Sequence, residues 1–157
     1  MSISIENIEF ELINLLNEEL NHLVIEGKAT INTQPEENGF SFSLTPFDKR
    51  HASIYAFCEN GGTIVYLTVG CNTVLEVPIE GKGYTNISGE EELLSIIRAV
   101  VNQGFEETIY ESKGKVVKSV GKLFIKNETE PITMKNSTLH NPFSRKSIIV
   151  KKYIPYY

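Results

Sequence analysis

Residues 102–117, NQGFEETIYESKGKVV, decide the fold class because they mark the change from a helix to a β-hairpin. An apolar helical pattern stops at Gly104, and glycine readily adopts the backbone conformation that ends a helix. A strand is predicted over 105–112, and the Lys-Gly pair at 113–114 predicts a tight turn. The chain should then return as a second strand over 115–126, beside the first.

The two-residue turn also sets the expected register of this hairpin. Glu111 should lie opposite Val116, and Ile109 should lie opposite Lys118. Alternation along the strand should place Glu107 on the same face as Ile109 and Glu111. Lys118 would then be a diagonal neighbour of Glu111, an attraction of about 0.2–1 kcal/mol.

The segment before the hairpin predicts a helix that lies flat on a sheet. Ser88 and Glu91 have the spacing of a capping box, in which side chains satisfy backbone N–H groups at the helix start. The apolar residues that follow form a broad face. These are Leu93, Leu94, Ile96, Ile97, Val100 and Val101.

The first half of the chain predicts one more helix and about five strands. Apolar residues recur at three- and four-residue steps from Ile5 to Leu23, which indicates an amphipathic helix that Gly27 ends. Pro78 indicates an edge strand or a strand end, because proline cannot donate to the ladder. The strands are predicted over 28–33, 40–44, 53–58, 63–70 and 73–79, with a last one near 147–153.

These elements together predict an α+β fold. The strands mostly follow one another through short turns, which is typical of an antiparallel sheet. We therefore expect a mostly antiparallel sheet of about six to eight strands with two helices packed on one face. The sequence contains no internal repeat and no linker, so residues 1–157 are expected to form a single α+β domain.

The formal charge of −5 is unevenly distributed. Residues 1–130 hold all 20 acidic residues and carry a formal charge of −10. The charged residues of 131–157 are all basic and give this segment a charge of +5. One interpretation is a basic segment packed beside an acidic body; the other is a basic tail that grips phosphates or a membrane surface. The overall acidity argues against a nucleic-acid partner. With no signal-peptide pattern and no apolar run of about 18 residues, a cytoplasmic protein without a membrane partner is expected.

Residues with catalytic or metal-binding chemistry are scattered along the chain. The histidines, His22, His51 and His140, lie in three different segments without the spacing of paired ligands. We therefore predict no metal site, no cofactor and no enzymatic activity. Cys58 and Cys71 are too few for a disulfide framework, and both are expected to be small buried side chains.

The strand at 105–112 carries the main candidate for a binding surface. Glu106, Glu107 and Glu111 stand close to Tyr110 along it. Such a group suits a basic protein partner, because charge steers the encounter and an aromatic side chain can anchor the complex. The alternative is an ordinary solvated hairpin whose charges discourage aggregation.

The loop TPFDKRH at 45–51 provides one further candidate. Asp48 within it is the only aspartate of the chain. Because loops often carry function, Asp48 is added to the predicted partner-binding residues. The alternative is a solvated connection between two strands.

The order of a helix, a strand meander and the segment EELLSIIRAVVNQGFEETIYESKGKVVKSVGKLFI at 91–125 resembles some small bacterial immunity proteins of polymorphic toxin systems. Those are cytosolic, acidic, single-domain α+β proteins that bind a cognate toxin and block it. The resemblance lies in pattern, size and charge, so it assigns no family residue to this chain, and the basic C-terminal segment departs from it. It implies a non-enzymatic protein that neutralises a basic toxin domain, such as a nuclease, through an acidic surface.

Two alternatives remain open at this point. One is a small-ligand-binding protein or an enzyme with a pocket between the sheet and the helices. The other is an interaction module that binds through its basic C-terminal segment, 131–157. Against the latter, SIIVKKYI at 147–154 has the pattern of a strand with a buried side.

Overall fold

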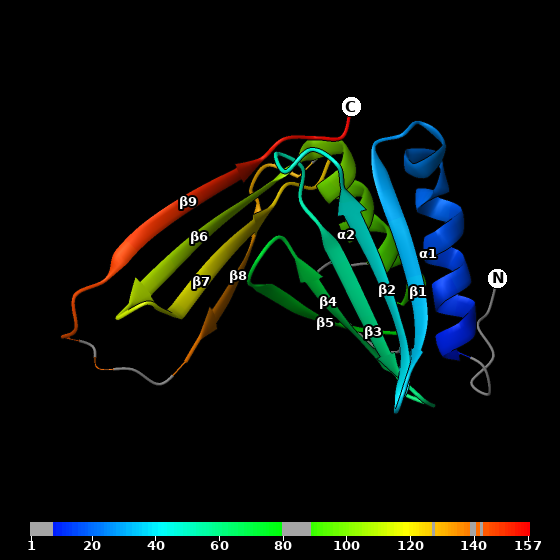
Figure 1. The fold of residues 1–157 in the computed structure, drawn as a ribbon, viewed down its shortest axis with the longest axis horizontal. Coiled ribbons are helices and arrows are strands. Elements are labelled where there is room, and N and C mark those ends of the chain that lie inside the picture. The colour runs from blue at the N-terminus through cyan, green and yellow to red at the C-terminus, as the bar shows by residue number, and fades with distance from the viewer. Residues whose placement is uncertain (1–7, 80–88, 127, 139–140, 142) are drawn as a thin grey trace.

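The computed structural model describes residues 8–79, 89–126, 128–138, 141 and 143–157. Within these residues, two helices and nine strands form two antiparallel sheets, which confirms the predicted α+β class (Figure 1). The strand count exceeds the expected six to eight, and the strands divide between two sheets.

The first sheet is a five-stranded meander in which each strand pairs with its neighbours in sequence. Along β3, β4 and β5 alternate residues are buried, as expected for an antiparallel sheet with one solvated face. Pro78 ends β5, which is an edge strand, as predicted. The strands are β1 (Ala29–Glu36), β2 (Gly39–Pro46), β3 (Ile54–Glu59), β4 (Ile64–Val69) and β5 (Thr73–Pro78).

Two helices, α1 (Ile8–Ile25) and α2 (Glu90–Gln103), share one apolar core with the buried face of this sheet. α1 packs on β1 and β2 through buried leucines, and α2 buries the broad apolar face that the sequence predicts. α2 ends at Gly104, where φ is 82°, a conformation that favours glycine. The predicted helix starts, near Ile5 and at Ser88, lie outside the described residues.

The second sheet has the strand order β8-β7-β6-β9. Its strands are β6 (Phe105–Ser112), β7 (Lys115–Leu123), β8 (Ile132–Ser137) and β9 (Ser147–Tyr153). The hairpin β6–β7 and the last strand β9 were predicted, and β8 was not. β9 pairs with β6, so the basic C-terminal segment lies beside an acidic strand and is not a loose tail.

The hairpin register changes just beyond the turn. Glu111 pairs with Val116 as expected, but Lys118 pairs with Tyr110. The prediction that Ile109 faces Lys118 is therefore wrong, because a bulge between Tyr110 and Glu111 shifts the ladder. The ammonium group of Lys118 lies 5.1 Å from the centroid of the Tyr110 ring, a cation–π distance.

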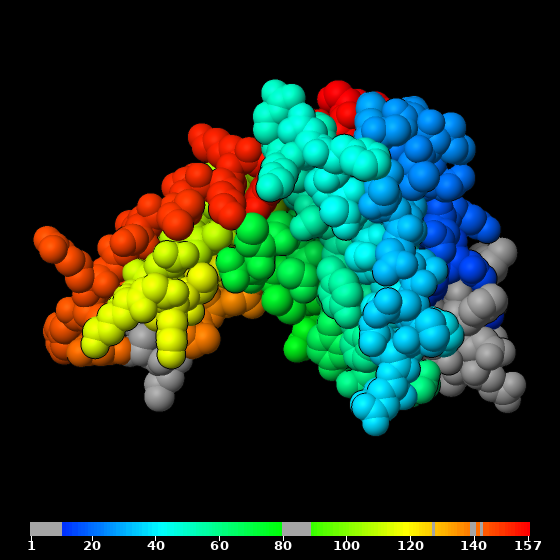
Figure 2. Space-filling model, in the orientation of Figure 1, coloured from blue at the N-terminus to red at the C-terminus, as the bar shows by residue number. Residues whose placement is uncertain are grey.

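The two sheets meet at a shared junction and then diverge, and Figure 2 shows the hollow between them. Phe105, Leu123 and Met134 of the second sheet belong to the same core as the helices and the first sheet. At Gly121 an added Cβ would lie 2.6 Å from Cγ2 of Thr73, so only glycine lets β7 approach the start of β5 this closely.

Candidate functional site

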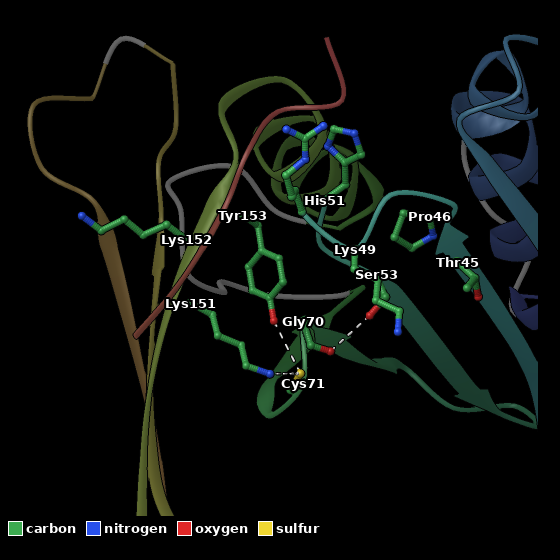
Figure 3. A pocket seen from close by; sticks show the side chains of 11 residues that line it. Thr45, Pro46, Lys49, His51, Ser53, Gly70, Cys71, Lys151, Lys152 and Tyr153 are labelled. Atoms are coloured by element: carbon green, nitrogen blue, oxygen red, sulfur yellow. Dashed lines mark hydrogen bonds between the residues drawn. The ribbon is translucent and has the colours of Figure 1, made fainter. Parts of the chain in front are cut away.

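A cleft of about 550 Å³ lies at the junction of the two sheets (Figure 3). Three segments that are far apart in sequence line it: the end of β2 with the β2–β3 loop at 45–53, the β4–β5 turn at 70–71, and the end of β9 at 151–153. The volume falls within the range of small-ligand sites.

The cleft is cationic. Lys49, Arg50, Lys151 and Lys152 line it, although the side chain of Lys152 points away from Cys71, to the opposite face of β9 (Figure 3). No lining residue among those described is acidic. Asp48 lies next to this group and binds Arg50, with Nη2 of Arg50 2.6 Å from Oδ2 of Asp48. This pairing offsets part of the charge of Arg50. Within the described part of the chain, the three lysines form no ion pair with a carboxylate.

The thiol of Cys71 is exposed at one wall of the cleft. Nζ of Lys151 donates to its Sγ at 3.0 Å, and the hydroxyl oxygen of Tyr153 lies 3.5 Å from the same sulfur (Figure 3). The hydrogen bond to Cys71 raises the pKa of Lys151, so this ammonium group stays charged at neutral pH. The prediction of a buried side chain is therefore wrong for Cys71 and correct for Cys58.

The carboxylate of Glu107 is fully buried behind this wall. The backbone N–H groups of Cys71 and Asn72 donate to it at 3.1 and 2.6 Å. The hydroxyl groups of Thr73 and Tyr153 donate to it at 3.0 and 3.1 Å. Glu107 therefore fastens the β4–β5 turn to the second sheet and holds Cys71 in place.

Two neighbours of Glu107 complete this arrangement. Gly70 has a φ of 67°, and an added Cβ would lie 2.8 Å from Oε2 of Glu107, so the turn requires glycine here. Burial, with smaller contributions from Cys71 and Glu107, raises the pKa of Tyr153 far above its usual range. Its hydroxyl group therefore remains protonated and serves as a donor to Glu107.

The opposite wall is fixed by the C-terminal residues. Nδ1 of His51 lies 3.1 Å from the carbonyl oxygen of Ile154, and the backbone N–H of Ile154 donates to the carbonyl of Arg50 at 2.8 Å. The ring of His51 stacks on the buried ring of Tyr156, with 4.5 Å between their centroids. The hydroxyl of Tyr156 donates to the carbonyl of Ala52 at 2.7 Å. These contacts hold the β2–β3 loop against the end of the chain.

The structure removes one residue, Glu107, from the predicted acidic surface and leaves the others partly exposed. Glu107, expected at a partner interface, is buried, because strand alternation turns it toward the junction. Glu106 lies on the opposite face of β6, paired across the two ladders with Lys122 and Lys152, and its Oε1 lies 3.8 Å from Nζ of Lys122. Glu111 is half-buried, and its charge contributes to the raised pKa of Lys151.

The other predicted residues have different surroundings. Tyr110 is half-buried beside Lys118 on the same face as Glu106. Asp48 lies at the rim of the cleft through its pairing with Arg50, so the loop at 45–51 contributes to the site with its bases.

The thiol and its lysine were not recognised from the sequence. Cys71 and Lys151 are separated by 80 positions, so no local motif joins them. One signal was present: the acidic pair at 106–107 and the basic pair at 151–152 face each other in the β6–β9 ladder. Matching these pairs would have placed Lys151 beside Glu107.

Comparisons with known proteins gave no match to a protein-family model, a curated protein or a solved structure. Among the residues that the structure describes, no group of three or more His, Cys, Asp or Glu side chains is placed to hold a metal ion. None of the described helices combines the length and the apolar character needed to cross a membrane.

Proposed function

We propose that this chain is a non-enzymatic binding protein whose cleft recognises an anionic group, a carboxylate or a phosphate. The observation that carries the proposal is that the basic side chains of Lys49, Arg50 and Lys151 line the cleft without an acidic lining residue among those described. Such cations attract anions at a distance and form strong charge-assisted hydrogen bonds on contact. The cleft lies between two sheets and not between a sheet and the helices.

A second candidate function, an immunity-type inhibitor, is favoured by the exposed edge of β9. Among the described strands only β6 pairs with β9, and Ile148 and Val150 on it are 62% and 54% exposed. An apolar edge strand of this kind can accept a strand from a partner protein. Because β9 ends in the lysines of the cleft, that partner would present an acidic segment. The binding surface of this chain would then be basic, whereas the resemblance implied an acidic one.

The first test uses anions as probes. Citrate, pyrophosphate and a short poly-glutamate peptide are titrated into the protein by calorimetry at low and at physiological salt. We expect binding that weakens with salt, because screening reduces charge attraction. Replacing Lys49 and Lys151 together by Gln should weaken binding at least about tenfold through loss of charge-assisted contacts.

A matched control removes the same number of charges elsewhere. Lys118 and Lys135 lie outside the cleft lining, on β7 and β8, and are replaced together by Gln. This double variant should retain nearly all of the affinity. Equal losses in the two double variants would show that only net charge matters and would overturn the proposal, as would the absence of binding to all three probes.

The probes also separate the two sources of the anionic group. Tight binding of citrate or pyrophosphate indicates a small ligand. Binding of the peptide alone, abolished when Ile148 and Val150 are both changed to Lys, indicates a protein segment that pairs with β9. The lysine substitutions keep the strand exposed while making its edge unfavourable for pairing.

A further inference from the structure

We propose that Cys71 is a nucleophilic thiol, paired as a thiolate with the ammonium group of Lys151, that forms mixed disulfides with low-molecular-weight disulfides. This assigns a covalent modification site to the cleft and goes beyond reversible anion binding. It does not depend on which anion the cleft takes.

The geometry supports a stabilised thiolate. The thiolate, not the thiol, is the nucleophile, and a cationic neighbour favours it. Nζ of Lys151 lies 3.0 Å from Sγ, a direct contact between the ammonium group and the sulfur. The raised pKa of Lys151 keeps that ammonium group protonated beside the sulfur.

The groups around the sulfur carry both signs of charge: the ammonium group of Lys151 contacts Sγ, and the carboxylates of Glu107 and Glu111 act on Lys151 from β6. From β9, Lys151 and Tyr153 face Sγ, and Tyr153 keeps its proton because burial raises its pKa. From β6, Glu107 directs its carboxylate at backbone N–H groups of the turn and at two hydroxyl groups. From the β2–β3 loop, the cleft is lined by Lys49, Arg50 and His51.

Access to the two cysteines differs. Cys71 is exposed and lines a cleft with the volume of a small-ligand site, whereas Cys58 in β3 is only 2% exposed. A buried thiol in apolar surroundings is normally inert. Cys58 therefore serves as an internal reference within the same chain.

The reaction balances without an added oxidant. The Cys71 thiolate attacks one sulfur of a disulfide R–S–S–R, and a new bond forms between Sγ and that sulfur. The original S–S bond breaks, and its electron pair leaves with the second sulfur as the thiolate R–S⁻. The product is a mixed disulfide on Cys71, which leaves the Lys151 ammonium group without its thiolate partner.

The experiment uses the full chain and uncharged reagents, so that anion binding by the cleft does not influence the result. Bis(2-hydroxyethyl) disulfide and iodoacetamide react with the folded protein over a range of pH, and peptide mass spectrometry follows each cysteine separately. Lys151→Met should slow both reactions of Cys71 about three- to tenfold at neutral pH. Without the ammonium group a smaller fraction of Cys71 is ionised, and this loss outweighs the greater intrinsic nucleophilicity of the thiolate that remains. The pH of half-maximal rate should rise.

Two further variants make the result specific. Lys152→Met removes the neighbouring charge, and Cys71 should then react within about twofold of the parent rate, since of these two lysines it is Lys151 that contacts the sulfur. Lys151→Arg keeps the charge and should restore most of the rate. An unchanged rate and pH profile in Lys151→Met, or reaction of Cys58 as fast as Cys71 in the folded protein, would overturn the proposal.

Discussion

Glu107 was predicted to lie on an exposed binding surface, and the structure buries it completely. Its buried carboxylate accepts four hydrogen bonds, two of them from the backbone of the β4–β5 turn. Glu107→Gln places an NH₂ group against these donors and leaves at least one of them unsatisfied. We expect a loss of about 1–3 kcal/mol in the free energy of unfolding, the usual cost of an unpaired buried polar group.

Urea denaturation measures this loss, and the adjacent residue provides the control. The side chain of Glu106 is 23% exposed and forms a long ion pair with Lys122, at 3.8 Å. Glu106→Gln should therefore change the free energy of unfolding by no more than about 0.5 kcal/mol. Similar small effects of both substitutions would mean that Glu107 does not anchor the turn.

Gly70 offers a test of the close contact between the turn and Glu107. Gly70 and Gly61 have nearly equal φ values of 67° and 66°, but an added Cβ meets other atoms only at Gly70. Gly61→Ala should show only the backbone strain of a left-handed residue, about 1–2 kcal/mol. Gly70→Ala should add about 1–3 kcal/mol from overpacking against Glu107 and Tyr153. Thermal or urea denaturation of both variants would reveal equal effects if the contact is unimportant.

Asp48 and Arg50 predict a pH effect at the rim of the cleft. Hydrogen bonds from Arg50 lower the pKa of Asp48 to about 2. Because the folded-state pKa is depressed, the stabilisation is present above the ordinary pKa of about 3.9 and is lost as pH falls through about 2. NMR titration of the carboxyl carbon should show this value, and Arg50→Gln should return it toward the ordinary range. An unchanged pKa in the variant would contradict the pairing.

At the level of elements, local patterns identified most strands and both helices. The hairpin and β9 have strong alternation or turn signals, and β9 spans Ser147–Tyr153 where a strand near 147–153 was predicted. β8 is short and polar, ITMKNS, and it has only one buried residue, so periodicity could not reveal it. The division into two sheets was also not predictable, because alternation shows which residues share a face but not which strands pair.

The candidate site was less predictable than the fold for the same reason. Its parts come from the β2–β3 loop, the β4–β5 turn and β9, and only the pairing of β9 with β6 brings them together. Sequence spacing describes neighbours along one element. It therefore identified the carboxylates of β6 but could not indicate that Glu107 lies inside the junction.

The C-terminal segment should be a structural part of the fold. Tyr156 is only 3% exposed, its backbone N–H donates to the carbonyl of Val101, and its hydroxyl donates to Ala52. Tyr156→Ala should lower the free energy of unfolding by about 3–5 kcal/mol, as for other large buried aromatic side chains. Tyr157 is 60% exposed, so Tyr157→Ala is the control. Equal melting temperatures for both variants would show that the segment is not docked.

At the scale of the whole molecule, the net charge and the charge of the cleft have opposite signs. The chain carries −5 overall, and yet the cleft gathers three bases, Lys49, Arg50 and Lys151. Charges further away than about 8 Å are largely screened at physiological salt, so the nearby lysines dominate the field that a bound anion experiences. At low salt the acidic remainder of the chain therefore slows the approach of an anion. It has a smaller effect on the affinity of the cleft for that anion.

The two sheets should unfold as one unit, in keeping with the prediction of a single domain. Phe105, Leu123 and Met134 of the second sheet are part of the apolar core that contains both helices, and Glu107 ties the first sheet to the second. Exposing the core of one sheet therefore exposes that of the other, which is the condition for a cooperative transition. Differential scanning calorimetry should give one peak whose van't Hoff enthalpy equals the calorimetric enthalpy. Two resolved peaks would show that the junction does not couple the sheets. The same conclusion would follow if amides of β6 and β7 exchanged through a separate sub-global opening, before those of β3 and β4.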